Sequence, residues 1–161
     1  MSGNGRLLTF EVAQRLYALP ISAILEVAET GGVSPVPTLP DSGGVMNWHG
    51  EALPVIAPDV LLGAAEGAEP PDAAEDDTAG DGAIVAREHV LVLSERGGEV
   101  PSLGLPIDAV HGLVEGMHGP RRIAAQALVI ERRPHEGRVM NVLDTRRLVA
   151  CARRWVEQSA A

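Results

Sequence analysis

Residues 43–56 read Gly-Gly-Val-Met-Asn-Trp-His-Gly-Glu-Ala-Leu-Pro-Val-Ile, and the rest of the chain can be interpreted from this stretch. Two apolar runs, Val45–Trp48 and Ala52–Ile56, flank the place of a tight turn. Gly50 can adopt the positive φ that two-residue hairpin turns often need. We therefore predict a β-hairpin with a Trp-His pair at its tip. No catalytic pattern is present in it, so we interpret the hairpin as a binding surface.

The chain contains a second copy of this pattern. The segment 50–61 aligns with 137–148 at an offset of 87 residues, with glycine at the first position of both. Leu19–Ile24 (Leu-Pro-Ile-Ser-Ala-Ile) also matches Leu105–Val110 (Leu-Pro-Ile-Asp-Ala-Val), at an offset of 86. Two matches at nearly one offset indicate a duplicated unit, of about five short strands in each copy.

Short antiparallel strands protect their edges best by closing into a small barrel. We therefore expect two barrels side by side, with a C-terminal helix over the seam between them. The apolar and polar residues of Arg6–Val12 alternate with the period of a strand. Further strands are predicted at Arg15–Leu19, Ile24–Glu29, Val90–Leu93, Val100–Pro106, Ala109–Glu115 and Arg138–Leu143, while residues 123–130 remain strand or loop.

Two segments have helical patterns. Pro58–Leu62 is predicted to be a short helical turn that closes the first unit. Residues 145–158 carry an apolar stripe at helical spacing, with Asp144 or Thr145 as the N-cap.

The net charge of −9 is unevenly distributed. Residues 64–83 carry −7 and contain no Lys or Arg, so the remainder carries −2. Their composition predicts a flexible acidic insertion that acts as a solvated spacer. The alternative is that this acidic segment attracts a basic partner. The nearly neutral remainder and the few aromatic residues (two Trp, one Tyr, one Phe) argue against nucleic-acid binding.

The sequence contains no motif for catalysis or for a cofactor. The histidines and the cysteine have none of the usual metal-ligand spacings; they are His49, His111, His118, His135 and Cys151. A Gly-x-Ser-x-Gly elbow and a phosphate-binding loop are also missing. We expect a protein that is not an enzyme and holds no cofactor or metal. The absence of a signal peptide and of a long apolar run predicts a cytoplasmic location.

Four places in order along the chain resemble the CheW-like domain family, the coupling proteins of bacterial chemotaxis signalling. They are Leu8–Val12; Tyr17–Ile21 followed by Ile24–Val27; Pro35–Pro37 leading to Gly44–Asn47 and Leu53–Ile56; and Leu103–Val110. The ending from Val142 to Leu148 also resembles the family. The resemblance covers about residues 6–150, with a first barrel half at 6–63, the acidic insertion at 64–83 and a second barrel half at 88–150.

The resemblance implies a mainly β fold of two pseudo-repeated, five-stranded SH3-like barrels. It also implies a scaffold that joins the regulatory domain of a CheA-type histidine kinase to the cytoplasmic tip of a methyl-accepting chemoreceptor, with other CheW-like domains as further candidate partners. Such a scaffold works in the cytoplasm and is recruited to membrane-associated receptor arrays. The positions that match the receptor- and kinase-binding surface are Ile24, Glu26, Val27, Asn47, Trp48, His49 and Gly50.

Three of these positions have a purely structural alternative. Ile24 and Val27 would equally suit a core, and Gly50 would equally suit its turn.

The hairpin tip departs from the family pattern. Asn47-Trp48-His49-Gly50 stands where the family usually has Asn-Leu-Arg-Gly, and Ala57-Pro58-Asp59 replaces its common Asp-Leu-Arg. Histidine is shorter than arginine and mostly neutral at pH 7. One alternative is therefore a divergent member that binds only the kinase or the receptor and modulates a non-chemotaxis phosphorelay. Another is a small-barrel module that binds a small ligand or a nucleic acid.

Overall fold

The computed structural model describes residues 5–29, 33–35, 43–66, 87–95, 98–115 and 128–160, and the protein is mainly β. The strands are β1 (Arg6–Val12), β2 (Arg15–Pro20), β3 (Ile24–Glu29), β4 (Val33–Pro35), β5 (Gly43–Trp48), β6 (Glu51–Ile56), β7 (His89–Leu93), β8 (Leu103–Ile107), β9 (Ala109–Glu115), β10 (Val129–His135) and β11 (Arg138–Leu143). The helices are the 3₁₀ turn η1 (Ile21–Ala23), α1 (Pro58–Glu66) and α2 (Thr145–Ala160).

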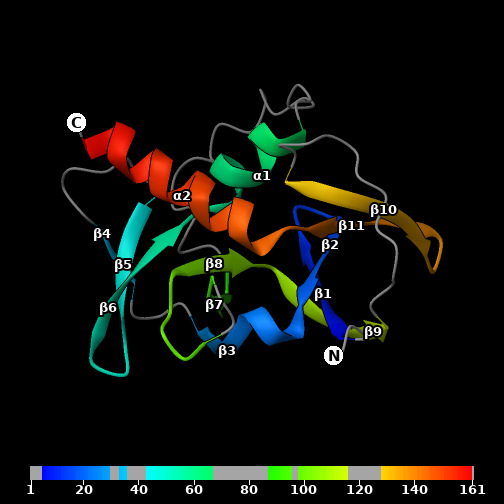
Figure 1. Cartoon of the computed structure of the whole chain (residues 1–161), viewed down its shortest axis with the longest axis horizontal. Coiled ribbons are helices and arrows are strands. Elements are labelled where there is room, and N and C mark those ends of the chain that lie inside the picture. Colours follow the sequence, from blue (N-terminus) through cyan, green and yellow to red (C-terminus); the bar gives the residue numbers. More distant parts are fainter. Residues whose placement is uncertain are drawn as a thin grey trace.

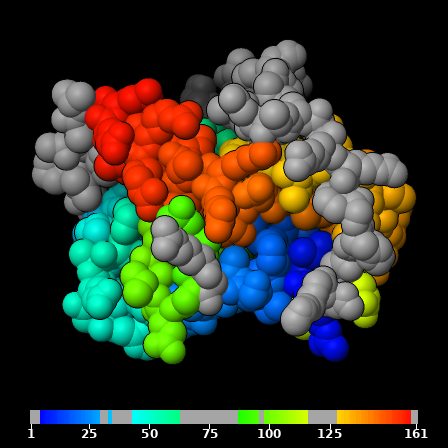
Figure 2. Space-filling view, viewed as in Figure 1, coloured from blue at the N-terminus to red at the C-terminus, as the bar shows by residue number. Residues whose placement is uncertain are grey.

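These strands form two curled sheets (Figure 1). Sheet A has the order β10-β11-β2-β1-β9, and sheet B has the order β3-β7-β8-β6-β5-β4. Neighbouring strands are antiparallel except at one place in each sheet, where β11 lies parallel to β2 and β6 lies parallel to β8. Helix α2 crosses the molecule above both sheets, as the space-filling view also shows (Figures 1 and 2).

The two sequence repeats exchange strands between the sheets. Sheet A takes β1 and β2 from the first repeat and β9 to β11 from the second, while sheet B takes β3 to β6 from the first and β7 and β8 from the second. The two curled sheets confirm the mainly β fold class, but each sheet is built from both repeats rather than from one. The chain passes between the sheets at η1 and again at Asp108, and these are equivalent positions in the repeat. The acidic insertion thus separates the repeats without separating the sheets.

Some strands are buried on both faces and contribute side chains to two apolar clusters of the described residues. Strand β7 is an example. Leu91 and Leu93 pack in a central core between the sheets, while Val90 and Val92 point into the interior of sheet B. Strand β2 does the same on the other side, with Leu19 in the central core and Ala18 inside sheet A. A continuous aliphatic run is what a strand with two buried faces requires.

Two-residue turns close three hairpins in the described part of the chain. Positive φ angles occur at Ala13 and Gln14 (52° and 69°), at His49 and Gly50 (51° and 88°) and at Glu136 and Gly137 (53° and 84°). Paired positive φ values give the type I′ turn, whose twist matches that of the flanking strands. The glycine shared by the two repeats therefore sits at the same turn position in both, as the alignment predicted.

The predicted helices are confirmed at their starts. Pro58 begins α1, where its missing N–H costs nothing. The Asp144 carboxylate accepts the Arg147 N–H at 3.1 Å and thus caps α2. Neither helix in the described part of the chain is long and apolar enough to cross a membrane.

Two boundaries differ from the prediction by more than two residues. Helix α1 continues to Glu66, so the start of the segment 64–83 is helical rather than flexible, and the rest of that segment lies outside the described residues. Strand β8 begins at Leu103 instead of Val100, because Pro101 has no N–H to donate to a ladder.

Candidate partner-binding site at the β5–β6 hairpin

The tip of the β5–β6 hairpin is tied to strand β3 through one carboxylate. The indole Nε1 of Trp48 donates a hydrogen bond to Glu26 Oε1 at 2.9 Å. His49 Nε2 lies 3.2 Å from the same oxygen. The two rings meet edge to face, with their centroids 4.3 Å apart. Glu26 therefore holds both rings of the tip in one arrangement.

The contact between Glu26 and the hairpin tip depends on the curl of sheet B. In the strand order, β3 and β5 are separated by β7, β8 and β6, so a flat sheet would keep Glu26 and Trp48 apart. Trp48 packs at the margin of the sheet B interior, where Leu25 and Ala28 of β3 also contact the cluster. A register shift between Ile24 and Glu26 leaves Leu25 unpaired, as in a β-bulge. The outward carboxylate of Glu26 then faces the hairpin.

The turn itself is closed by a second local bond. The Asn47 side-chain oxygen accepts the Gly50 N–H at 2.9 Å. Gly50 has a φ of 88° and open space on the side where a Cβ would stand, so only its backbone conformation requires glycine. Asn47 and Gly50 thus maintain the turn, and the side chains that remain available to a partner are those of Trp48 and His49.

The tip is exposed and polar at its centre. The side chain of His49 is 66% exposed and that of Glu26 is 43% exposed. Hydrogen bonds from Trp48 and from His49 lower the pKa of the Glu26 carboxyl from its ordinary value. At neutral pH the site therefore presents the Glu26 carboxylate beside the side chains of Trp48 and His49. These groups suit recognition by contact.

The structure unites most of the predicted site residues. Glu26 joins Trp48 and His49, and Asn47 and Gly50 form the turn beside them. The remaining two, Val27 and Ile24, lie on the same strand as Glu26. The sequence pattern could not reveal the Glu26–Trp48 bond, because nothing local connects two residues on non-adjacent strands.

The two apolar positions of β3 differ in their surroundings. Val27 is 41% exposed, so it is not core. Ile24 is half-buried and packs against the central core. This position agrees with the core role that the sequence left open for Ile24. Val27 is therefore an exposed apolar residue of β3, next in sequence to Glu26.

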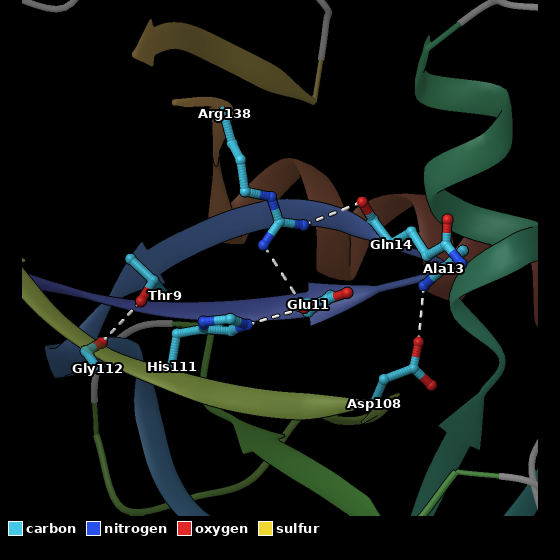
Figure 3. Close-up of polar contacts among 8 residues, drawn as sticks. All are labelled: Thr9, Glu11, Ala13, Gln14, Asp108, His111, Gly112 and Arg138. Carbon is cyan, nitrogen blue, oxygen red and sulfur yellow. Dashed lines mark hydrogen bonds and ion pairs between the residues drawn. The ribbon is translucent and has the colours of Figure 1, made fainter. Parts of the chain in front are cut away.

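A second polar cluster, on sheet A, was not predicted. His111 Nε2 lies 2.8 Å from Glu11 Oε1, and the Arg138 guanidinium lies 3.6 Å from the same oxygen. Figure 3 shows both side chains directed at Glu11. The hydrogen bond from His111 and the charge of Arg138 lower the pKa of Glu11. Nearby, Asp108 Oδ2 accepts the Ala13 N–H at 2.7 Å. This cluster ties β1, β9 and β11 together and so reinforces the strand exchange.

Comparison with family models matches residues 6–153 to the model described as CheW-like domain. The chain belongs to the CheW-like domain family. Its fold is similar to the crystal structure of the scaffolding protein TtCheW from Thermoanaerobacter tengcongensis, with a TM-score of 0.59 and 20% identity over 87% of this chain and 88% of that one. Comparison with the curated proteins finds no match.

Membership of the CheW-like family agrees with the mainly β architecture and with the repeat seen in the sequence. Proteins of this family are scaffolds, and their chemistry is that of contact surfaces. The hairpin tip, whose side chains hold one another in place, is the candidate for such a surface in this chain.

Proposed function

We propose that this CheW-like protein is a non-enzymatic adaptor that couples the cytoplasmic tip of a methyl-accepting chemoreceptor to the regulatory domain of a CheA-type histidine kinase. Family membership over residues 6–153 supports the class of function. The receptor tip lies in the cytoplasm, so the adaptor works there, within membrane-associated arrays. No covalent step is needed: a scaffold changes the activity of a kinase by binding one of its conformations more tightly than another.

The observation that carries the proposal is the construction of the hairpin tip. The bonds from Trp48 and His49 to Glu26 join β3 and the β5–β6 hairpin into a single preorganised surface. Preorganised side chains lose little conformational entropy when a partner binds. The exposed Val27 offers apolar surface on the same strand as Glu26. Tryptophan is among the residue types that most often dominate interface energies, and Trp48 belongs to this surface.

The test is co-sedimentation with receptor-tip fragments and with the kinase regulatory domain, using the Glu26→Ala variant. Loss of the carboxylate frees both rings, so we expect about a tenfold weaker receptor interaction. Glu99→Ala is the matched control, because it removes an exposed carboxylate outside the site. If wild-type protein sediments with neither partner, the adaptor role is wrong. If Glu26→Ala and Glu99→Ala behave alike, the binding surface lies elsewhere.

A substitution at the hairpin tip also tests the alternative in which the protein binds only the kinase or only the receptor. His49 replaces the arginine that the family usually has, and its Nε2 is the ring nitrogen that lies near Glu26. His49→Arg restores a permanent cation with a planar fork. A large gain in receptor binding with unchanged kinase binding would indicate a protein that engages the kinase alone. Unchanged binding of both partners would indicate that the histidine site is competent as it stands.

A further inference from the structure

Sheet A carries a cationic pocket that lies apart from the hairpin tip. The pocket has a volume of about 350 Å³ and lies where the β10–β11 hairpin meets the β1–β2 turn. Three arginines line it, namely Arg15, Arg132 and Arg138. They come from three different strands, so the strand exchange is what brings them together.

Neutral groups hold two of these arginines in place. Arg138 donates to the backbone oxygen of Gln14 at 3.0 Å, as Figure 3 shows. Arg132 donates through Nε to the Asn141 side-chain oxygen at 3.1 Å. Asn141 is itself fixed by donation to the backbone oxygen of Leu16 at 3.1 Å. These bonds orient the guanidinium groups without cancelling their charge.

The positive charge in the pocket exceeds the negative charge beside it. Among the described residues, the carboxylate paired with Arg138 is that of Glu11, at 3.6 Å, and Glu11 also binds His111. Arg132 has no carboxylate partner in the described part of the chain. This concentration of cations belongs to a protein whose net charge is −9, so the local field opposes the overall one. Arg132 and Arg138 are therefore placed to bind anionic groups.

Apolar surface accompanies the cations. Val139 lines the pocket and is 56% exposed. A single inorganic anion would leave this side chain uncovered. A peptide that carries an apolar residue among carboxylates would satisfy both features, since arginine binds carboxylates through a planar, two-pronged fork.

We propose that this pocket binds an acidic peptide segment of a partner protein, with an apolar side chain placed on Val139 and carboxylates on Arg132 and Arg138. The pocket lies on sheet A, whereas the hairpin tip lies on sheet B, so this proposal rests on a surface other than the one that carries the proposed function.

Fluorescence anisotropy of a labelled peptide with four glutamates on each side of one leucine tests the proposal on the full chain at low salt. We expect binding to wild-type protein and about fivefold weaker binding to Arg132→Gln. Arg154→Gln is the matched control, because it removes the same charge from an exposed position on α2 outside the pocket. A peptide with glutamine in place of glutamate is expected not to bind, and one with serine in place of leucine is expected to bind more weakly.

Three outcomes would overturn the proposal. The first is no binding to the wild-type protein. The second is equal weakening by Arg132→Gln and Arg154→Gln, which would reflect net charge alone. The third is displacement of the peptide by inorganic phosphate beyond the effect of sodium chloride at equal ionic strength, which would indicate a simple ion site. Arg132 is exposed and is replaced by a polar residue, so we expect the thermal melt of Arg132→Gln to be unchanged. This measurement verifies that the variant is folded.

Discussion

Replacement of Met140 by alanine tests whether the exchanged strands make the two sheets one cooperative unit. Met140 lies on β11 and is fully buried in the interior of sheet A, among Leu16, Ala18 and Val142. Deleting a buried methionine side chain to alanine costs about 2–5 kcal/mol, through lost transfer free energy and the cavity left behind. For a chain of this size each kcal/mol lowers the melting temperature by about 2–4 °C, so we expect a decrease of about 4–20 °C.

The substitution is in sheet A, and its effect is measured with a fluorescent probe in sheet B. The chain has two tryptophans, and in a Trp155→Phe background the only one left is Trp48, which packs against the interior of sheet B. Each sheet contains strands from both repeats. We therefore expect the two sheets to unfold together, because neither repeat can unfold without removing strands from both sheets. We therefore expect Trp48 fluorescence and far-UV circular dichroism to report the same lowered midpoint for Met140→Ala.

Separate midpoints would refute this reasoning. If Trp48 kept the wild-type midpoint while circular dichroism showed early loss of strand signal, sheet B would be an independent unit. Val139→Ala is the control on the same strand. Its side chain is 56% exposed, and a surface substitution of this kind changes stability by no more than about 0.5 kcal/mol.

Three further measurements check local features. Gly104→Ala places a methyl group 3.0 Å from two valine methyls inside sheet B, so we expect a loss of about 1–3 kcal/mol in denaturant unfolding. Asp144→Ala removes the N-cap of α2 and is expected to cost about 1 kcal/mol in the same assay, with Asp144→Asn close to wild type. The folded-state pKa of Glu26 lies below its unfolded value, so its bonds stabilise the fold above the unfolded pKa and are lost as pH falls through the folded pKa. An NMR titration of the carboxyl should show this low midpoint, and Trp48→Phe should raise it.

The hairpins were predictable because their signals are local. Gly50 and Gly137 follow from the need for a positive φ in a two-residue turn, and the apolar residues on either side set the strands. The start of α2 was equally accessible, since Asp144 precedes an apolar stripe of helical period. The residues alone indicated the hairpin tip as a binding surface, but its partners and the β3 positions of the candidate site came only from the resemblance to the family, and the site stays a proposal.

The interactions between distant residues were not predictable from pattern. Glu26 and Trp48 lie on strands that are not neighbours in the sheet, so their bond depends on how far sheet B curls. The arginines of the cationic pocket are spread from Arg15 to Arg138 along the chain. No periodicity relates them, and only the pairing of β11 with β2 brings them to one place.

The sequence by itself determined a duplicated set of short strands, the turns between them and the helix after them, because each depends on the preferences of a few neighbouring residues. The tertiary structure alone decided that the repeats exchange strands. Strand pairing is set by which apolar faces can be buried together, and Leu91 and Leu93 reach the central core from β7, a strand of the second repeat that pairs with β3 of the first. The tertiary structure also joins the tip of the hairpin at 43–56 to β3 through Glu26, which no local pattern in the sequence indicates.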